Sequence, residues 1–98
     1  MAVIRTTRFE VAPADVEEMI ARRNALVAAV RNAFPGLTEA RLARVGEQVW
    51  VDSWRWESAA SPDAALQAVA TGALPGAGPA FTLARNASAE SAEVVDER

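Results

Sequence analysis

The side chains that could carry chemistry in this 98-residue chain are of few kinds. The sequence has no His, Cys or Tyr, which excludes thiol catalysis, zinc–thiolate sites, disulfides and a histidine base. Any metal site would need oxygen ligands alone. The acidic residues Glu10, Asp15, Glu17 and Glu18 are better explained as a solvated helix start, where negative charge complements the helix dipole. We therefore expect no metal and no cofactor, and chemistry carried by Arg, Asp and Trp.

Arg23 is the most informative single residue, because it interrupts an apolar helical stripe. At about 100° per residue, it falls between Ile20 and Val27, near the middle of that stripe. An arginine there extends to the edge of the stripe, pairs with a buried acid, or points into a cavity. Its natural partner is Asp52. The two could form a purely structural ion pair. Alternatively, Arg23 stabilises a substrate oxyanion while Asp52 orients it or acts as the base.

All three tryptophans lie within seven residues, at Trp50, Trp54 and Trp56. A period of two places them, together with Asp52, on one side of a strand. Such a stripe is typical of a core, but three indoles could also leave a flat apolar slot for a fused-ring ligand. We expect Arg23, Trp56 and Asp52 to be the catalytic candidates. The residues expected to contact substrate are Trp50, Trp54, Asn24, Thr7, Phe34, Leu74 and Phe81.

Three of these contacts depend on open alternatives. Asn24 flanks the helical stripe, where it could donate to a ligand or simply lie at the solvent edge. Residues 72–79 contain three Gly and two Pro, so they predict a loop rather than regular structure. This loop is either a lid that brings Leu74 and Phe81 to the ligand, or a long crossover into the last strand.

The first half of the chain predicts a strand, a helix and a hairpin. Residues 3–11 are β-branched and aromatic, as in a strand. Pro13 then suits the first turn of a helix that runs to about Phe34, where Pro35-Gly36 ends it. Residues 37–45 are compatible with strand or helix. The preceding breakers and a turn at Gly46-Glu47 favour a strand that forms a hairpin with the tryptophan strand.

The second half predicts one more helix and one more strand. Ser61-Pro62-Asp63 supplies a cap, a first-turn proline and an acid for a helix that runs to about Thr71. Residues 79–84 suggest a short helical turn, and residues 90–96 suggest the last strand. The order βαββαβ predicts an α+β, ferredoxin-like fold, a four-stranded antiparallel sheet with both helices on one face. Residues 1–98 would form a single domain.

The other face of this sheet would remain uncovered. Val and Leu side chains on it would form an apolar patch larger than monomers usually expose. We therefore expect a homodimer that pairs through the sheet faces.

With this element order, the chain resembles the antibiotic biosynthesis monooxygenase family of the dimeric α/β-barrel superfamily. The resemblance covers essentially the whole chain. It rests on the Phe-Pro-Gly-Leu sequence at residues 34–37 and on Trp56-Glu57-Ser58, where the third strand leads into the second helix. The family includes cofactor-independent oxygenases of aromatic polyketide intermediates, quinol oxygenases, haem-degrading enzymes and proteins without known activity. Haem-degrading members use an Asn, a Trp and a His. Trp56 matches that Trp and Thr7 the Asn, but the chain has no His, which argues against that branch.

The resemblance thus implies a cofactor-independent monooxygenase that oxidises a hydrophobic aromatic, polyketide- or quinol-like substrate with dioxygen in a cavity between helices and sheet. The alternative is a non-catalytic dimeric module that binds a small ligand or serves a structural role. A cavity of several hundred cubic ångströms containing Arg23 and Trp56 would favour the enzyme. A packed interior in which Arg23 bridges to Asp52 would favour the module.

Charge and hydropathy limit the other partners. A net charge of −3 argues against a nucleic-acid surface, which needs clustered positive charge. The start of the chain does not resemble a signal peptide, and no apolar run reaches membrane-spanning length. We expect a cytoplasmic protein without a nucleic-acid or membrane partner.

Overall fold

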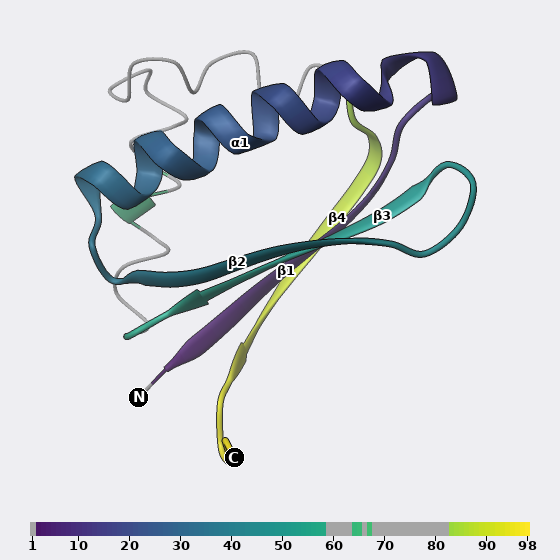
Figure 1. Cartoon of the computed structure of the whole chain (residues 1–98). Helices are drawn as coiled ribbons and strands as arrows, with labels where there is room; N and C mark the ends of the chain where they lie inside the picture. The colour runs from purple at the N-terminus through teal and green to yellow at the C-terminus, as the bar shows by residue number, and fades with distance from the viewer. Residues whose placement is uncertain (1, 59–63, 66, 68–82) are drawn as a thin grey trace.

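The computed structural model describes residues 2–58, 64, 65, 67 and 83–98, in which one long helix lies across one face of a sheet (Figure 1). The elements are β1 (Val3–Glu10), the 3-10 turn η1 (Pro13–Asp15), α1 (Val16–Ala33), β2 (Leu37–Arg44), β3 (Val49–Trp56) and β4 (Arg85–Glu93). Within the described residues, no helix has the length and apolar composition needed to cross a membrane.

The strands form one sheet in the order β2-β3-β1-β4, and every neighbouring pair is antiparallel. This order and the position of α1 confirm the predicted ferredoxin-like α+β fold. The predicted second helix falls largely outside the described residues, although Ala64, Ala65 and Gln67 are helical. The predicted loop at residues 72–79, with Leu74, and Phe81 from the predicted turn also lie outside them.

Helix α1 forms where its sequence places an apolar stripe between polar ends. Pro13 begins η1, and Glu17 and Glu18 lie in the first turn of α1, where their charge complements the helix dipole. The helix ends at the Phe34 N–H, which donates to the Val30 carbonyl at 2.7 Å. Its stripe is buried at Met19, Leu26, Val27 and Val30. The helix therefore presents one face to the sheet, and Arg23 lies within that face.

The register between β1 and β3 places the tryptophans on the helix side. Phe9 pairs with Trp50 and Thr7 with Asp52, so these side chains share one face of the sheet. Phe9, Trp50 and Asp52 are buried, as is Trp56 farther along the strand. The period-two prediction for β3 is confirmed.

Most of the buried apolar residues form two groups under α1. One surrounds Trp56 and contains Leu26, Val27, Val30, Leu37 and Ala65. The other surrounds Trp50 and contains Phe9, Val11 and Met19. Because Asp52 lies between Trp50 and Trp56 on β3, and Arg23 lies between Met19 and Leu26 on α1, these two charged residues separate the apolar groups.

The β2–β3 hairpin is confirmed at its predicted place. The backbone N–H groups of Val45 and Gly46 donate to the Val49 carbonyl at 2.9 and 3.2 Å. Arg44 closes the turn, because its Nε and Nη2 donate to the carbonyls of Gly46 and Glu47 at 3.2 and 3.1 Å. Its guanidinium also lies 5.3 Å from the centroid of the Trp50 ring, a cation–π contact.

The last strand is β4 (Arg85–Glu93), so the predicted span of 90–96 was wrong at both ends. All nine residues are exposed, and several have low strand propensity, so composition gave little sign of the strand. Its position comes from pairing with β1, where Val3 faces Glu93 and Arg8 faces Ser88. The register shifts between Arg8 and Glu10, near Asn86, which has a left-handed φ of 52°.

The outer face of the sheet, opposite α1, is less apolar than predicted. Leu37 and Leu42 pair with Trp56 and Asp52, so both leucines face the helix. The outer face instead alternates half-buried apolar groups with polar and charged ones. Its members include Ile4, Val49, Val51, Thr6, Arg8, Arg41, Arg55 and Glu90. The expected Val and Leu patch is therefore a mixed surface.

Candidate functional site

Arg23 and Asp52 form a two-pronged ion pair between α1 and the sheet. Arg23 Nη2 donates to Asp52 Oδ1 at 2.9 Å, and Nε donates to Oδ2 at 3.1 Å. The side chains are only 15% and 9% exposed. The predicted partnership of these two residues is confirmed. Because water reaches little of either group, removing one partner would leave a poorly solvated charge.

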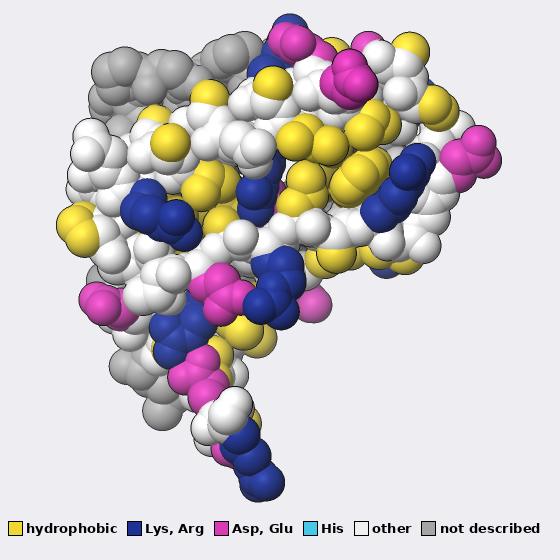
Figure 2. All heavy atoms as spheres, viewed as in Figure 1, with side chains coloured by type: hydrophobic (Ala, Val, Ile, Leu, Met, Phe, Trp, Pro, Cys, Tyr) yellow, Lys and Arg dark blue, Asp and Glu magenta, His cyan; other side chains and the backbone are white. Residues whose placement is uncertain are grey.

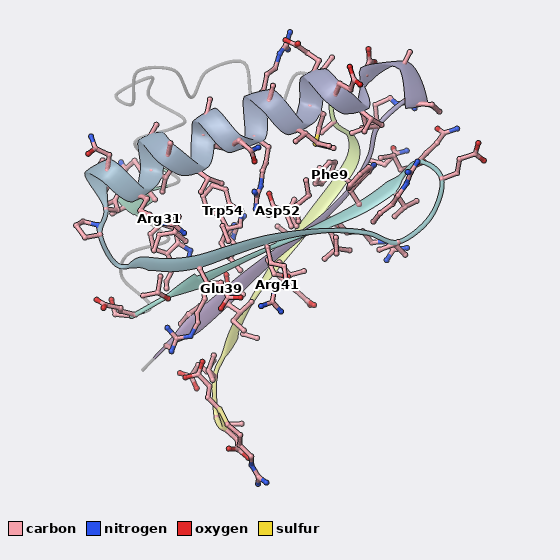
Figure 3. All side chains as sticks on the ribbon, viewed as in Figure 1. Phe9, Arg31, Glu39, Arg41, Asp52 and Trp54 are labelled. Carbon is pink, nitrogen blue, oxygen red and sulfur yellow. The ribbon has the colours of Figure 1, made fainter. Side chains whose placement is uncertain are left out.

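The pair is positioned by elements that are distant in sequence. Arg23 comes from the sheet-facing stripe of α1, and Asp52 from the middle of β3. Figure 3 shows Asp52 in the layer between helix and sheet, with Trp54 to one side and Phe9 to the other. Glu39 and Arg41, on β2, project from the opposite side of the sheet. The polar pair therefore lies inside the layer that otherwise forms the core.

Asn24 contacts the Arg23 guanidinium from the solvent side of the ion pair. Its side-chain oxygen accepts a hydrogen bond from Arg23 Nη1 at 3.1 Å, and the residue is exposed. The guanidinium is thus held by Asp52 on one side and by Asn24 on another. The predicted contact of Asn24 with a ligand remains a prediction.

A small recess opens beside the ion pair and has a volume of about 30 Å³. Among the described residues, its lining is mostly apolar, with one hydroxyl and the ion pair. The lining residues are Thr7, Phe9, Met19, Arg23, Leu26, Asp52, Ala84 and Ala87. A single water needs about 10–15 Å³, whereas a ligand pocket is typically several hundred. The recess therefore has room for a polar head group or about two waters.

Figure 2 shows the molecule hollowed along the seam below α1, with hydrophobic side chains gathered on both sides of a basic group. Half-buried apolar residues pack against the two core groups and widen this apolar surrounding. They include Phe34, Ala40 and Trp54 around Trp56, and Val16, Ile20 and Leu42 around Trp50. Thus predicted contact residues Trp54 and Phe34 lie in the layer of the ion pair, whereas neither lines the recess itself.

The two buried indoles belong to the core rather than to the recess. Trp56 is 1% exposed and Trp50 is 7% exposed, and neither lines the recess. Trp54 lies against Trp56, with ring centroids 6.4 Å apart. Among the described residues, the Nε1–H groups of Trp50 and Trp56 have no acceptor. Two buried donors without a partner are unusual in a folded protein.

Some of the recess could have been anticipated from sequence and some could not. Thr7 was predicted, and Phe9, Met19 and Leu26 carry the apolar periodicity of their elements. Ala84 and Ala87 could not have been predicted from the sequence, because small side chains in or near an exposed edge strand show no apolar periodicity. Leu74 and Phe81 are outside the described residues. Within the described part of the chain, acidic side chains form no metal-binding group.

A second ion pair, on the outer face of the sheet, has the same local geometry. Arg55 Nε and Nη2 donate to the carboxylate oxygens of Glu97 at 2.6 and 2.8 Å, and Nη1 donates to Thr38 Oγ1 at 2.8 Å. The hydrogen bond from Arg55 lowers the pKa of Glu97, and the hydrogen bond to Glu97 raises the pKa of Arg55. This pair ties the C-terminal segment to β3.

No protein-family model matches the sequence, and no curated protein matches it significantly. Solved structures do match. SnoaB from Streptomyces nogalater, a cofactor-independent oxygenase, was solved as a point mutant. It is 25% identical, with a TM-score of 0.71 over 98% of this chain and 95% of that one. A point mutant of MhuD, solved with two manganese protoporphyrin IX molecules per active site, is 28% identical, with a TM-score of 0.76 over 98% and 97%.

A Caulobacter crescentus protein assigned to the antibiotic biosynthesis monooxygenases shares the fold at 22% identity, with a TM-score of 0.72 over 97% of this chain and 91% of that one. These likenesses extend over nearly the whole length of each chain. They agree with the resemblance drawn from the element order and from residues 34–37. The likeness to SnoaB supports a monooxygenase-like function. The chain is therefore similar in structure, over nearly its whole length, to SnoaB and to an antibiotic biosynthesis monooxygenase-like protein.

Proposed function

We propose that this protein is a cofactor-independent monooxygenase that oxidises a hydrophobic aromatic, polyketide- or quinol-like substrate at the Arg23–Asp52 pair. The observation that carries this proposal is a guanidinium–carboxylate pair set between two apolar groups beside a recess. The likeness to the oxygenase SnoaB supports it.

The pair offers the two functions that such a reaction needs. Each oxygen of Asp52 accepts one hydrogen bond from Arg23 and keeps a second lone pair, which could receive a proton from the substrate. The guanidinium would then stabilise the oxyanion that forms, in a layer from which water is largely excluded. The electron-rich anion supplies the electrons to dioxygen. One oxygen atom enters the substrate, converting a methylene to a carbonyl, and the other leaves as water.

A porphyrin does not fit this chain as it fits MhuD. The sequence lacks His, Cys and Tyr, three of the four side chains that commonly ligate haem iron. The recess of about 30 Å³ is also far smaller than a macrocycle. We therefore propose no porphyrin chemistry for this protein.

The alternative, a non-catalytic dimeric module that binds a small ligand or serves a structural role, is favoured by a specific observation. Arg23 is bridged to Asp52, and the recess beside them is small. This is the packed interior expected of a module whose ion pair serves only to join α1 to β3. The two functions differ in whether the pair meets a substrate.

Oxygen consumption distinguishes them. The protein would be tested without added cofactor against phenols, anthrones and quinols, beside the variant Glu97→Gln, which alters the outer ion pair and leaves the Arg23–Asp52 pair intact. We expect uptake by the wild type and by Glu97→Gln, and its loss in the double variant Arg23→Met, Asp52→Leu. Uptake that persists in the double variant would remove the pair from the mechanism. Absence of uptake with every substrate would favour the module.

We also propose that two copies pair through the outer faces of their sheets. Ile4, Val49 and Val51 supply a small apolar centre there, and charged residues of both signs surround it. A twofold interface of this composition can match opposite charges across the axis. Sedimentation at micromolar concentration should give the mass of a dimer, and a monomer would contradict the pairing.

A further inference from the structure

The charge balance of the site indicates which ligands it can admit. We infer that the Arg23–Asp52 site selects an uncharged hydroxyaromatic ligand over an aromatic carboxylate, and that removing the charge of Asp52 reverses this preference. The inference concerns the same site as the proposed function and rests on it for the identity of the pocket. It names the class of ligand that the site selects.

The Arg23–Asp52 pair carries no net charge as a unit. One guanidinium faces one carboxylate, and the other described residues that line the recess carry no charge. A carboxylate that entered would be a second negative charge in a poorly hydrated space with one cation for two anions. Burying an unpaired charge is strongly unfavourable, so the site should reject such a ligand.

A hydroxyl group matches the donors of Arg23 and the acceptors of Asp52 that remain available. Arg23 uses its Nε–H, one N–H of Nη1 and one N–H of Nη2, which leaves one further N–H on each terminal nitrogen. Asp52 keeps acceptor capacity on both oxygens. A ligand hydroxyl can donate to Asp52 and accept from Arg23 or from the Thr7 hydroxyl, which lies directly across from Asp52 on β1. A carboxylate can only accept.

The size of the recess also limits which part of a ligand can enter. The recess of about 30 Å³ takes a hydroxyl head group and not a whole ring. Only the hydroxyl would enter the recess, and the ring would extend from its opening, past the apolar side chains of Phe9, Met19 and Leu26. These residues also contact the core around the tryptophans, since Phe9 and Met19 are grouped with Trp50, and Leu26 with Trp56.

Replacing Asp52 with Asn removes the negative charge of the pair and keeps the shape of the side chain. In Asp52→Asn, Arg23 keeps its charge and loses its anion. An incoming aromatic carboxylate could then take the place of the missing charge and form the two-pronged pair with the guanidinium. Anions should therefore bind to this variant and be excluded from the wild type.

The experiment uses phenol, benzamide and benzoate at pH 7, with binding followed through the indole N–H signals of Trp50, Trp54 and Trp56 in NMR titrations. Benzamide matches benzoate in shape and differs in charge. We expect benzoate to bind the wild type at least about tenfold more weakly than phenol, a factor that corresponds to about 1.4 kcal/mol. We expect Asp52→Asn to bind benzoate at least about tenfold more tightly than the wild type does.

Glu97→Gln is the matched control, because it makes the same carboxylate-to-amide change in a two-pronged arginine pair on the outer face. It should keep the preference of the wild type. Equal binding of benzoate and phenol by the wild type, or no gain of benzoate binding by folded Asp52→Asn, would overturn the inference. Should Asp52→Asn not fold, the wild-type comparison alone decides.

The outcomes also separate this inference from the proposed oxygenase. The expected binding pattern without oxygen uptake would leave the ligand preference standing and remove the enzyme. Oxygen uptake with aromatic carboxylates as the best substrates would keep the enzyme and overturn the preference. Failure of all three probes to bind would overturn the preference.

Discussion

Two arginine–carboxylate pairs lie on opposite faces of one sheet, and their local geometry is nearly the same. Inside, Arg23 uses Nε and Nη2 on Asp52 and Nη1 on Asn24. Outside, Arg55 uses Nε and Nη2 on Glu97 and Nη1 on Thr38. The side chains of the inner pair are 15% and 9% exposed, and those of the outer pair 27% and 51%. The two pairs therefore differ in their exposure to solvent and not in their hydrogen-bond geometry.

This difference shows why only one of the two pairs is a candidate site. In a single chain, water and salt screen the outer pair, so its net contribution to stability is small, as for most surface ion pairs. The inner pair lies between apolar groups, where each charge depends on the other. A bound molecule that exchanges a proton or charge with the inner pair would therefore strongly change the free energy of the site. The same event at the outer pair would change it little.

The largest expected effect comes from breaking the inner pair on one side. Arg23→Ala leaves the Asp52 carboxylate buried without its cation, so we expect the free energy of unfolding to fall by about 3–5 kcal/mol. Urea denaturation would measure the loss. Arg55→Ala, the same change on the outer face, should have a much smaller effect.

A double variant tests whether the loss comes from the stranded charge. Arg23→Met with Asp52→Leu replaces both charged groups with apolar ones, and such replacements are often neutral or stabilising. We expect it to recover most of the stability lost in Arg23→Ala. Equal destabilisation by the single and double variants would show that packing around Arg23, rather than charge pairing, is the cause.

A smaller effect is expected at Arg44, whose guanidinium meets no carboxylate among the described residues. It holds two carbonyls of the β2–β3 turn and covers the Trp50 ring. Arg44→Ala should cost about 1 kcal/mol of unfolding free energy, since exposed cation–π contacts and single hydrogen bonds are each modest. Arg44→Lys should retain part of the ring contact and lose the forked bonds to the turn. No change in urea midpoint would show that the turn closes without Arg44.

The smallest effect is a pH dependence of the outer pair. The pKa of Glu97 is lowered from 4.5 in the folded protein, so the unfolded state binds protons more readily. The stabilisation is present above about pH 4.5 and is lost as the pH falls through the lower, folded value. Thermal unfolding of the wild type should therefore show a small contribution in that window that Glu97→Gln lacks. Identical pH profiles would show that the pair is fully screened.

Much of the inner pair could be predicted before any coordinates. The step of three and four residues along α1 placed Arg23 in the buried stripe, and the period of two along β3 placed Asp52 among the tryptophans. Local periodicity is sufficient here, because each element is amphipathic on its own and its apolar face must meet the other. The four-stranded antiparallel sheet followed from the same elements and the usual handedness of their connections.

Three features came only from the assembled fold. The span of β4 depends on pairing with β1 and not on its own exposed, polar residues. The register of β2 turned Leu37 and Leu42 toward the helix, which left the outer face mixed instead of apolar. The buried indoles filled the core, so the recess beside Arg23 is small. Periodicity along one strand fixes which residues share a face, but registers and volumes depend on contacts between segments that are distant in sequence.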